Sequence, residues 1–216
     1  MYVRKRPIFL QELEKGEIDC MSCWNPSIII HECKLRVDGI TRYVDNQIFE
    51  FDNTYCENET TNDMYCNSIL PEMDFIFNGG TLTIFAYGQT GSGKTYTINE
   101  LQSFLCKDLF RASDLHYEDT KINIWFSVSY FEIYGGKIYD LLNKRKKLKI
   151  MESGKNKIEV PGLREIMVKN KDELTDVIDF ARSERWTEST WSNLTSSRSH
   201  AIWKINLHDA DKSSRK

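Results

Sequence analysis

The sequence predicts a layered α/β domain, and three observations support that prediction. Segments with the apolar pattern of strands alternate along the chain with segments of helical periodicity. The 216 residues are enough to bury one core, and 40% hydrophobic with 28% charged residues is a globular balance. The sequence contains no internal repeat, low-complexity tract or Gly/Ser-rich linker. We therefore expect a single domain over residues 1–216.

The strands are predicted from apolar runs and from alternation. Residues 81–87 form a nearly continuous apolar run, which is typical of a strand covered on both faces. Residues 200–207 alternate instead, so one face should carry Ala201, Trp203, Ile205 and Leu207. Residues 122–134 are rich in β-branched and aromatic side chains. A further strand is expected at 28–37, and a hairpin at 148–160.

Two helices are predicted from apolar residues three and four positions apart. The first covers about 95–110, with Ile98, Leu101, Leu105 and Leu109 on one face. The second covers about 171–185, with a stripe of Leu174, Val177, Ile178 and Ala181. Asn170 suits the N-cap of this second helix, and Glu173 can complete a capping box.

Charge and hydropathy exclude several classes of partner. The formal net charge is −3, so no global basic field favours nucleic acid or an anionic membrane, and a partner held by charge would need a local patch. The longest apolar run is far too short to span a bilayer. The charged N-terminus is not followed by an apolar core of signal-peptide length, so we expect an intracellular protein.

The cysteines raise the alternative of a zinc site. Six cysteines in a chain of this length do not suggest a disulfide framework. Cys20, Cys23, His31 and Cys33 superficially resemble a ligand set, and His31 and Cys33 would share a strand face. The set lacks a second tight pair, however, and free cysteines are common in cores, so we favour a reading without zinc.

The strongest chemical signal is a phosphate-binding loop between the apolar run and the first helix. It consists of Gly88, Gln89, Thr90, Gly91, Ser92, Gly93, Lys94 and Thr95. Glycines allow a tight loop whose amide groups point at phosphate oxygens, and the helix start also favours an anion. Lys94 would contact the β- and γ-phosphates, and the Thr95 hydroxyl would coordinate Mg²⁺. The motif predicts binding of a nucleoside triphosphate.

Three ordered segments make the resemblance more specific. The run from Phe85 to Thr97 resembles the kinesin form of the loop, and Val3-Arg-Lys-Arg-Pro7 resembles the kinesin adenine strand. Asn193-Leu-Thr-Ser-Ser-Arg-Ser-His200 resembles the kinesin switch I segment, and the run from Tyr130 to Leu142 resembles the long kinesin strand with its turn. The chain thus resembles the kinesin motor domain over essentially its whole length. The resemblance implies a P-loop NTPase fold with a central, mostly parallel or mixed sheet and helices on both faces.

The resemblance also implies roles for individual residues. Arg4, Arg6 and Pro7 would line one side of the adenine, and Tyr96 would stack on the other. Asn193 belongs to the nucleotide site, Ser196 would contact Mg²⁺, and Ser197 would lie near the attacking water. Arg198 would sense the γ-phosphate and, with Lys94, serve catalysis. The implied ligands are ATP or ADP with Mg²⁺, and the implied partner is tubulin in microtubules, with neither nucleic acid nor membrane as partner.

Two segments are candidates for contact with tubulin. Arg36, Val37 and Asp38 lie where internal-motor kinesins, which depolymerise microtubule ends, carry a Lys-Val-Asp fingertip. Arg36 keeps the positive charge but replaces a compact ammonium with a planar fork. Lys144, Arg145, Lys146 and Lys147 form a basic block that suits the acidic surface of tubulin. The resemblance therefore implies a microtubule-end depolymerising ATPase on cytoplasmic microtubules, the spindle included.

One part of the family pattern has no counterpart. A complete motor continues after residues 200–207 into switch II, with its Asp-x-x-Gly-x-Glu motif, and the sequence contains no such segment. We expect a motor domain that is incomplete at its C-terminus. The alternative is a nucleotide- or tubulin-binding module with little ATP turnover; a small-molecule kinase would leave the switch I and adenine-strand matches unexplained. The oligomeric state stays open.

Overall fold

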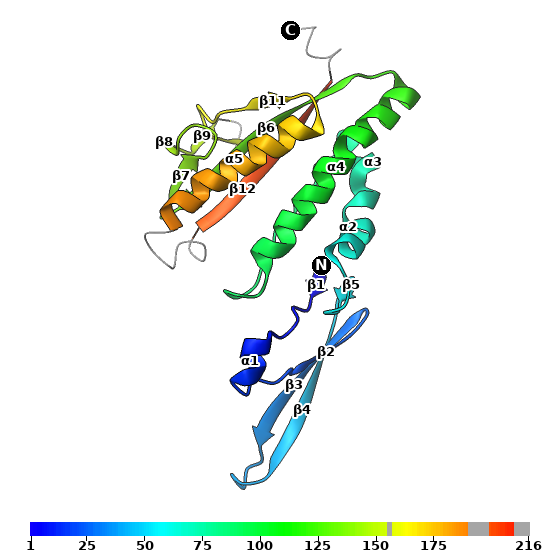
Figure 1. Ribbon diagram of the computed structural model, residues 1–216, viewed down its shortest axis with the longest axis vertical. Helices are drawn as coiled ribbons and strands as arrows, with labels where there is room; N and C mark the ends of the chain where they lie inside the picture. The colour runs from blue at the N-terminus through cyan, green and yellow to red at the C-terminus, as the bar shows by residue number, and fades with distance from the viewer. Residues whose placement is uncertain (155–156, 190–198, 210–216) are drawn as a thin grey trace. The chain divides into compact units, whose positions relative to one another are not determined.

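The structure is a computed structural model that describes residues 1–154, 157–189 and 199–209 (Figure 1). It divides into two compact units. The first unit comprises Met1–Pro71 with Phe85–Leu101, and the second comprises Glu72–Ile84 with Gln102–Lys216.

The first unit is built on short sheets. An antiparallel meander runs in the order β2-β3-β4, and β1 pairs in parallel with β5. Its elements are β1 (Tyr2–Arg4), α1 (Leu10–Glu14), β2 (Met21–Trp24), β3 (Ser27–Leu35), β4 (Arg42–Glu50), β5 (Asn53–Tyr55) and α2 (Thr61–Ser68). The strand expected at 28–37 is confirmed, because β3 pairs with β4 over its full length, from Ser27↔Glu50 to Leu35↔Arg42.

Helix α4 (Lys94–Thr120) begins directly after the glycine-rich loop, as predicted, but it is longer than expected. Leu101 and Leu109 are buried, in agreement with the helical stripe. The polar stretch 111–120 lacks glycine and proline, so the helix continues ten residues beyond the last predicted position.

The second unit contains the main hydrophobic core. The long strand β6 (Ile124–Tyr134) pairs with β12 (Ser199–Asp209) along all of its length on one side, and with β11 and β7 on the other. Phe126, Val128 and Tyr130 of β6 are buried in this core. Ala201, Trp203, Ile205 and Leu207 of β12 pack against the same cluster, which confirms the predicted alternation. The remaining strands are β7 (Lys137–Asp140), β8 (Lys146–Leu148), β9 (Met151–Ser153), β10 (Lys157–Glu159) and β11 (Ile166–Val168).

Helix α5 (Lys171–Ser189) begins at the predicted residue. The Asn170 side chain accepts a hydrogen bond from the Glu173 amide at 2.9 Å, and the Glu173 carboxylate accepts from the Lys169 amide at 2.9 Å. Leu174, Ile178 and Ala181 are buried in the core. The short helices η1 (Leu70–Glu72) and α3 (Met73–Phe77) complete the elements, and Phe77 meets Phe126 edge-on. β9 and β10 form the hairpin predicted within 148–160.

Two expectations about the sheet differ from the structure. The run 81–87 is not a strand: residues 81–89 have no regular structure, and Phe85 and Tyr87 are 82% and 96% exposed. A strand needs a hydrogen-bonded neighbour, and no described residue pairs with this run, so apolarity alone did not suffice. The α/β class holds, but among the described strands only β1 and β5 are parallel, and α4 and α5 contribute to one core cluster.

Candidate functional site: the glycine-rich loop and its surroundings

The glycine-rich loop has the backbone that its sequence requires. Gly91 and Gly93 have φ values of +83° and +91°, which other residues adopt only with strain. No atom lies within 4 Å of the position that a Cβ would occupy on either glycine. At Gly88, in contrast, a Cβ would lie 2.6 Å from the Ser92 hydroxyl oxygen. The loop is therefore tight at its start and open where an anion would approach the backbone.

Lys94 lies across this loop. Its Nζ donates to the backbone carbonyl oxygens of Gly88 at 2.8 Å and Gln89 at 2.7 Å. Thr95 follows it in the first turn of α4 and is exposed. The first amides of a helix have no intrahelical acceptor, and the helix dipole favours negative charge there. Glycines, a lysine ammonium, a threonine hydroxyl and free helix amides are the donors that a nucleotide phosphate with Mg²⁺ requires, so the residues present fit this ligand.

The base side of the site differs from the expected sandwich. The Arg4 guanidinium lies only 5.5 Å from the centre of the Tyr96 ring, in direct cation–π contact. A flat base between them would need about 7 Å, twice the stacking distance of about 3.5 Å. Tyr96 is 59% exposed and keeps an open ring surface. The adenine contacts therefore remain a prediction, and they require Arg4 and Tyr96 to separate or the base to use another face of Tyr96.

Arg6 is held away from Arg4 by its own partners. Its two Nη atoms donate to both carboxylate oxygens of Glu12, at 2.6 and 3.0 Å, and its guanidinium lies 4.3 Å from the Phe9 ring centre. The hydrogen bonds from Arg6 lower the pKa of Glu12 below its ordinary value. Pro7 is exposed beside this pair. The Arg6 side chain is thus held by Glu12 of α1, and Pro7 follows it in the chain.

Lys5 is a buried charged residue that sequence reasoning missed. Its Nζ donates to Asp19 at 2.6 Å and to Glu57 at 3.1 Å, and its amide donates to the Tyr55 carbonyl at 2.8 Å. The hydrogen bond from Lys5 lowers the pKa of Asp19. These bonds extend the β1–β5 pairing and fix the backbone between Arg4 and Arg6. Strand alternation places the Lys5 side chain on the face opposite to those of Arg4 and Arg6. Its partners Asp19 and Glu57 lie too far along the chain to be predicted from the local sequence.

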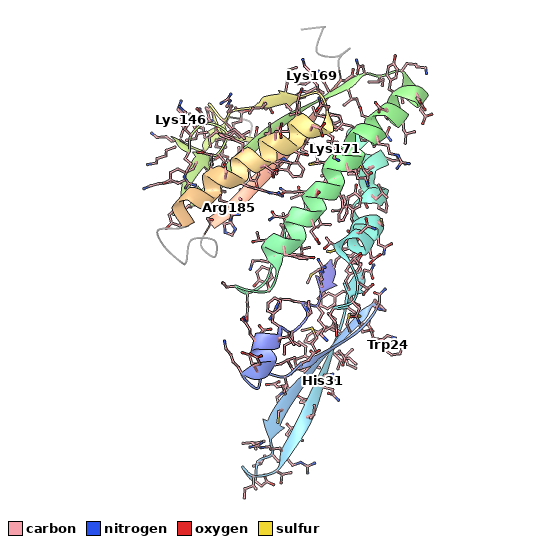
Figure 2. The ribbon with its side chains drawn as sticks, viewed as in Figure 1. Trp24, His31, Lys146, Lys169, Lys171 and Arg185 are labelled. Carbon is pink, nitrogen blue, oxygen red and sulfur yellow. The ribbon has the colours of Figure 1, made fainter. Side chains whose placement is uncertain are left out.

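The candidate switch I residues, Asn193, Ser196, Ser197 and Arg198, lie outside the described residues. The residues that flank the interval 190–198, Arg185 and Ser199, belong to a buried charge cluster that the sequence did not reveal. The Glu132 carboxylate, 2% exposed, forms ion pairs with Arg145 at 2.9 Å and with Arg185 at 3.4 Å. Arg185 near the end of α5, labelled in Figure 2, also donates to the Ser199 hydroxyl at the start of β12, at 3.2 Å.

This cluster changes the interpretation of the basic block. Lys144, Lys146 and Lys147 are exposed, and Figure 2 shows Lys146 on β8. Arg145 is 14% exposed, and its charge is directed at Glu132 and at the Tyr139 ring, 5.3 Å away. Its expected contact with tubulin stays a prediction, and it would require this side chain to leave the partners that hold it in the fold. The lysines remain candidates.

The expected fingertip lies at the turn of the β3–β4 hairpin. Arg36 donates its amide to the Thr41 carbonyl at 2.8 Å, and Val37 is fully exposed. The Asp38 carboxylate accepts from the Thr41 hydroxyl at 2.5 Å and from the Ile40 and Thr41 amides at 2.9 Å. Asp38 is thus occupied in shaping the turn, while the side chains of Arg36, Val37 and Ile40 are exposed at the tip.

The residues of the zinc alternative have other partners. The His31 ring nitrogens lie 2.8 Å from the Ser22 hydroxyl and 2.8 Å from the Asn46 side-chain oxygen; Figure 2 labels His31 on β3. Among the described residues, no group of three His, Cys, Asp or Glu side chains is arranged to hold a metal ion. The position of His31 is thus explained by hydrogen bonds across the meander.

Comparison with known proteins gives a consistent result. A family model described as "Kinesin motor domain" matches residues 4–216. A "Diatom spindle kinesin-1" from Cylindrotheca fusiformis is 40% identical over 208 residues, which are 96% of this chain and 33% of that protein. The human "Kinesin-like protein KIF24" is 39% identical over 217 residues, 97% of this chain and 16% of that protein. The "Kinesin-like protein KIN-13B" of Arabidopsis thaliana is 40% identical over 203 residues, 94% of this chain and 29% of that protein.

The extent of these matches decides the family. The chain spans a third or less of the length of these relatives, with 33%, 16% and 29% covered. No helix in the described part of the chain is long and apolar enough to cross a membrane. The family model matches nearly the whole chain. The chain belongs to the kinesin motor domain family.

Proposed function

We propose that the chain is the nucleotide-binding part of an ATP-dependent microtubule motor. The observation that supports this most is the loop at the start of α4, with Gly91 and Gly93 at positive φ and Lys94 lying across it. Lys94 would bind and orient the β- and γ-phosphates, and Thr95 with Ser196 would hold Mg²⁺. The bound metal supplies neutralisation of phosphate charge. Arg198 would add positive charge, and Ser197 would orient water for hydrolysis.

The partner that we propose is tubulin. Lys144, Lys146 and Lys147 offer exposed positive charge on a chain whose net charge is −3, so attraction to an acidic protein surface would be local. The exposed Arg36 and Val37 at the hairpin tip support the depolymerising class of motor. In that class we expect the tip and the lysines each to contact tubulin at microtubule ends, in the cytoplasm and on the spindle.

A second candidate is a nucleotide- or tubulin-binding module with little turnover. The observation that favours it is the run 81–89, which precedes the loop, pairs with no described strand and places Phe85 and Tyr87 in solvent. A loop that is not supported by a paired strand would hold its ligands in less constant positions. ATP could then bind without efficient hydrolysis.

Turnover of ATP by the intact protein, with and without microtubules, distinguishes these candidates. The variant Lys94→Ala should abolish ATP binding and turnover, whereas Lys107→Ala, an exposed lysine of the same helix, should change neither. Binding without microtubule-stimulated turnover would support the second candidate. Unchanged ATP binding in Lys94→Ala would refute the proposed nucleotide site.

The tubulin surface is tested by charge reversal. Lys146→Glu with Lys147→Glu should weaken microtubule binding at low salt, and the effect should shrink as salt screens the charges. The matched control reverses Lys169 and Lys171, which are also exposed lysines of the second unit and are labelled in Figure 2. An equal loss of microtubule affinity in the two double variants would show an effect of net charge and would contradict a specific binding surface at Lys146 and Lys147. The depolymerising class is tested by measuring whether the protein shortens stabilised microtubules in the presence of ATP. We expect Arg36→Ala to abolish this shortening.

A further inference from the structure

A hydrogen-bond network joins three elements of the first unit beside the glycine-rich loop. Nη1 of Arg4, at the end of β1, donates to the Thr61 hydroxyl at 2.7 Å and to the Thr97 hydroxyl at 3.1 Å. The Thr61 hydroxyl in turn donates to the Glu100 carboxylate. Thr61 is the first residue of α2, whereas Thr97 and Glu100 lie on α4, three residues apart and so on one face of the helix.

Thr61 is the centre of this network. A hydroxyl has one donor and two acceptor positions, and Thr61 uses the donor for Glu100 while accepting from Arg4. Thr61 is only 2% exposed, so water cannot readily replace either bond. The Thr60–Asp63 capping box, with bonds of 2.8 and 3.2 Å, fixes the helix start that carries Thr61.

The network acts where the phosphate-binding residues begin. Thr97 follows Lys94 by three residues, so Arg4 and Thr61 hold the first two turns of α4 against β1 and α2. The segment before the loop has no strand partner among the described residues. Within the first unit, the position of Lys94 and Thr95 therefore depends on the contacts that hold the start of α4.

We propose that Thr61 is a positioning residue for the phosphate-binding loop, acting through Arg4 and Glu100. This inference rests on the nucleotide site proposed above. It also gives Arg4 a role other than base contact: with 5.5 Å between its guanidinium and the Tyr96 ring centre, Arg4 braces the helix that presents the phosphate ligands. The phosphate affinity of the loop should then depend on a hydroxyl in α2.

The variant Thr61→Val tests this directly, because valine keeps the shape and removes the hydroxyl. The probes are Mg²⁺-tripolyphosphate, which has no base, and Mg²⁺-ADP, each titrated against the intact protein. Hydrogen bonds to charged groups have energies that correspond to about a tenfold change in affinity or more. We expect both affinities to fall about tenfold, and amide exchange in the first two turns of α4 to quicken without ligand. Thr61→Ser, which keeps the hydroxyl, should retain the original affinities and the original exchange rate.

The outcomes separate this inference from the proposed function. If Thr61→Val lowers the melting temperature but leaves tripolyphosphate affinity and α4 exchange unchanged, Thr61 is merely structural and the inference fails. Loss of ADP affinity alone would assign Arg4 to the base and also overturn it. Lys94→Ala measured with tripolyphosphate tests the nucleotide site itself: binding that survives in Lys94→Ala refutes the site, not only the positioning. Should Thr61→Val fail to fold, Glu100→Gln must show the same pattern in weaker form.

Discussion

The buried carboxylate of Glu132 gives the sharpest stability prediction. It forms ion pairs with Arg145 at 2.9 Å and with Arg185 at 3.4 Å, and only 2% of its side chain is exposed. Glu132→Gln keeps the shape but removes the negative charge that faces these two arginines. Breaking a buried ion pair by removing one partner costs about 3–5 kcal/mol.

The arginines set where in that range the change should fall. They are 14% and 24% exposed, so water partly compensates them, and the glutamine carbonyl can still accept one bond. We therefore expect a loss of about 3 kcal/mol. At roughly 2–4 °C per kcal/mol for a chain of this size, the melting temperature should fall by about 6–12 °C.

Thermal unfolding followed by tryptophan fluorescence measures this, since Trp125 and Trp203 lie on β6 and β12. The matched control is Asp179→Asn, which removes a partly exposed pair with Arg182 at 3.3 Å and should cost less than about 1 kcal/mol. Arg145→Met alone and combined with Glu132→Gln completes a double-mutant cycle. The reasoning is refuted if Glu132→Gln melts at the same temperature as the control.

Two further predictions concern titratable groups. The Thr41 hydroxyl and the Ile40 and Thr41 amides lower the pKa of Asp38, so the turn should be fully stable above the ordinary aspartate pKa of about 4 and loosen as the pH falls through the lower folded value; amide exchange at Gly39–Thr41 should show this, and Asp38→Asn should remove the pH dependence. Burial raises the pKa of the Cys106 thiol to about 11, so a thiol reagent at pH 8 should label the exposed Cys20, Cys33 and Cys66 first and Cys106 only on unfolding; early labelling of Cys106 would contradict its burial.

The elements that the sequence predicted well are those whose pattern records a local periodicity. β12 alternates between core and surface, and α5 carries its own N-cap and stripe, so neither prediction needed knowledge of distant residues. The run 81–87 failed because a strand also depends on a neighbour. Its apolar residues satisfied the pattern, but no described strand supplies the backbone partner.

The candidate site likewise contains residues that a local motif indicates and residues whose role depends on distant partners. The loop residues 88–95 were predictable because their chemistry is contained in one contiguous motif. Thr61 and Glu132 were not, since each derives its importance from partners 57 and 53 residues away, respectively, that only the fold brings close. Arg145 has an ion pair that the sequence did not indicate: its neighbours in sequence are exposed lysines, yet its guanidinium pairs with the buried carboxylate of Glu132.

The pairing of β12 has a consequence for handling the protein. All 11 residues of β12 pair with β6 on one side, and in the described part of the chain no strand pairs with its other side. That side presents a long row of backbone donors and acceptors, the template on which strands of separate molecules add to one another. Produced without a covering strand, the chain should self-associate as its concentration rises, and dilute solutions or an added edge strand should keep it monomeric.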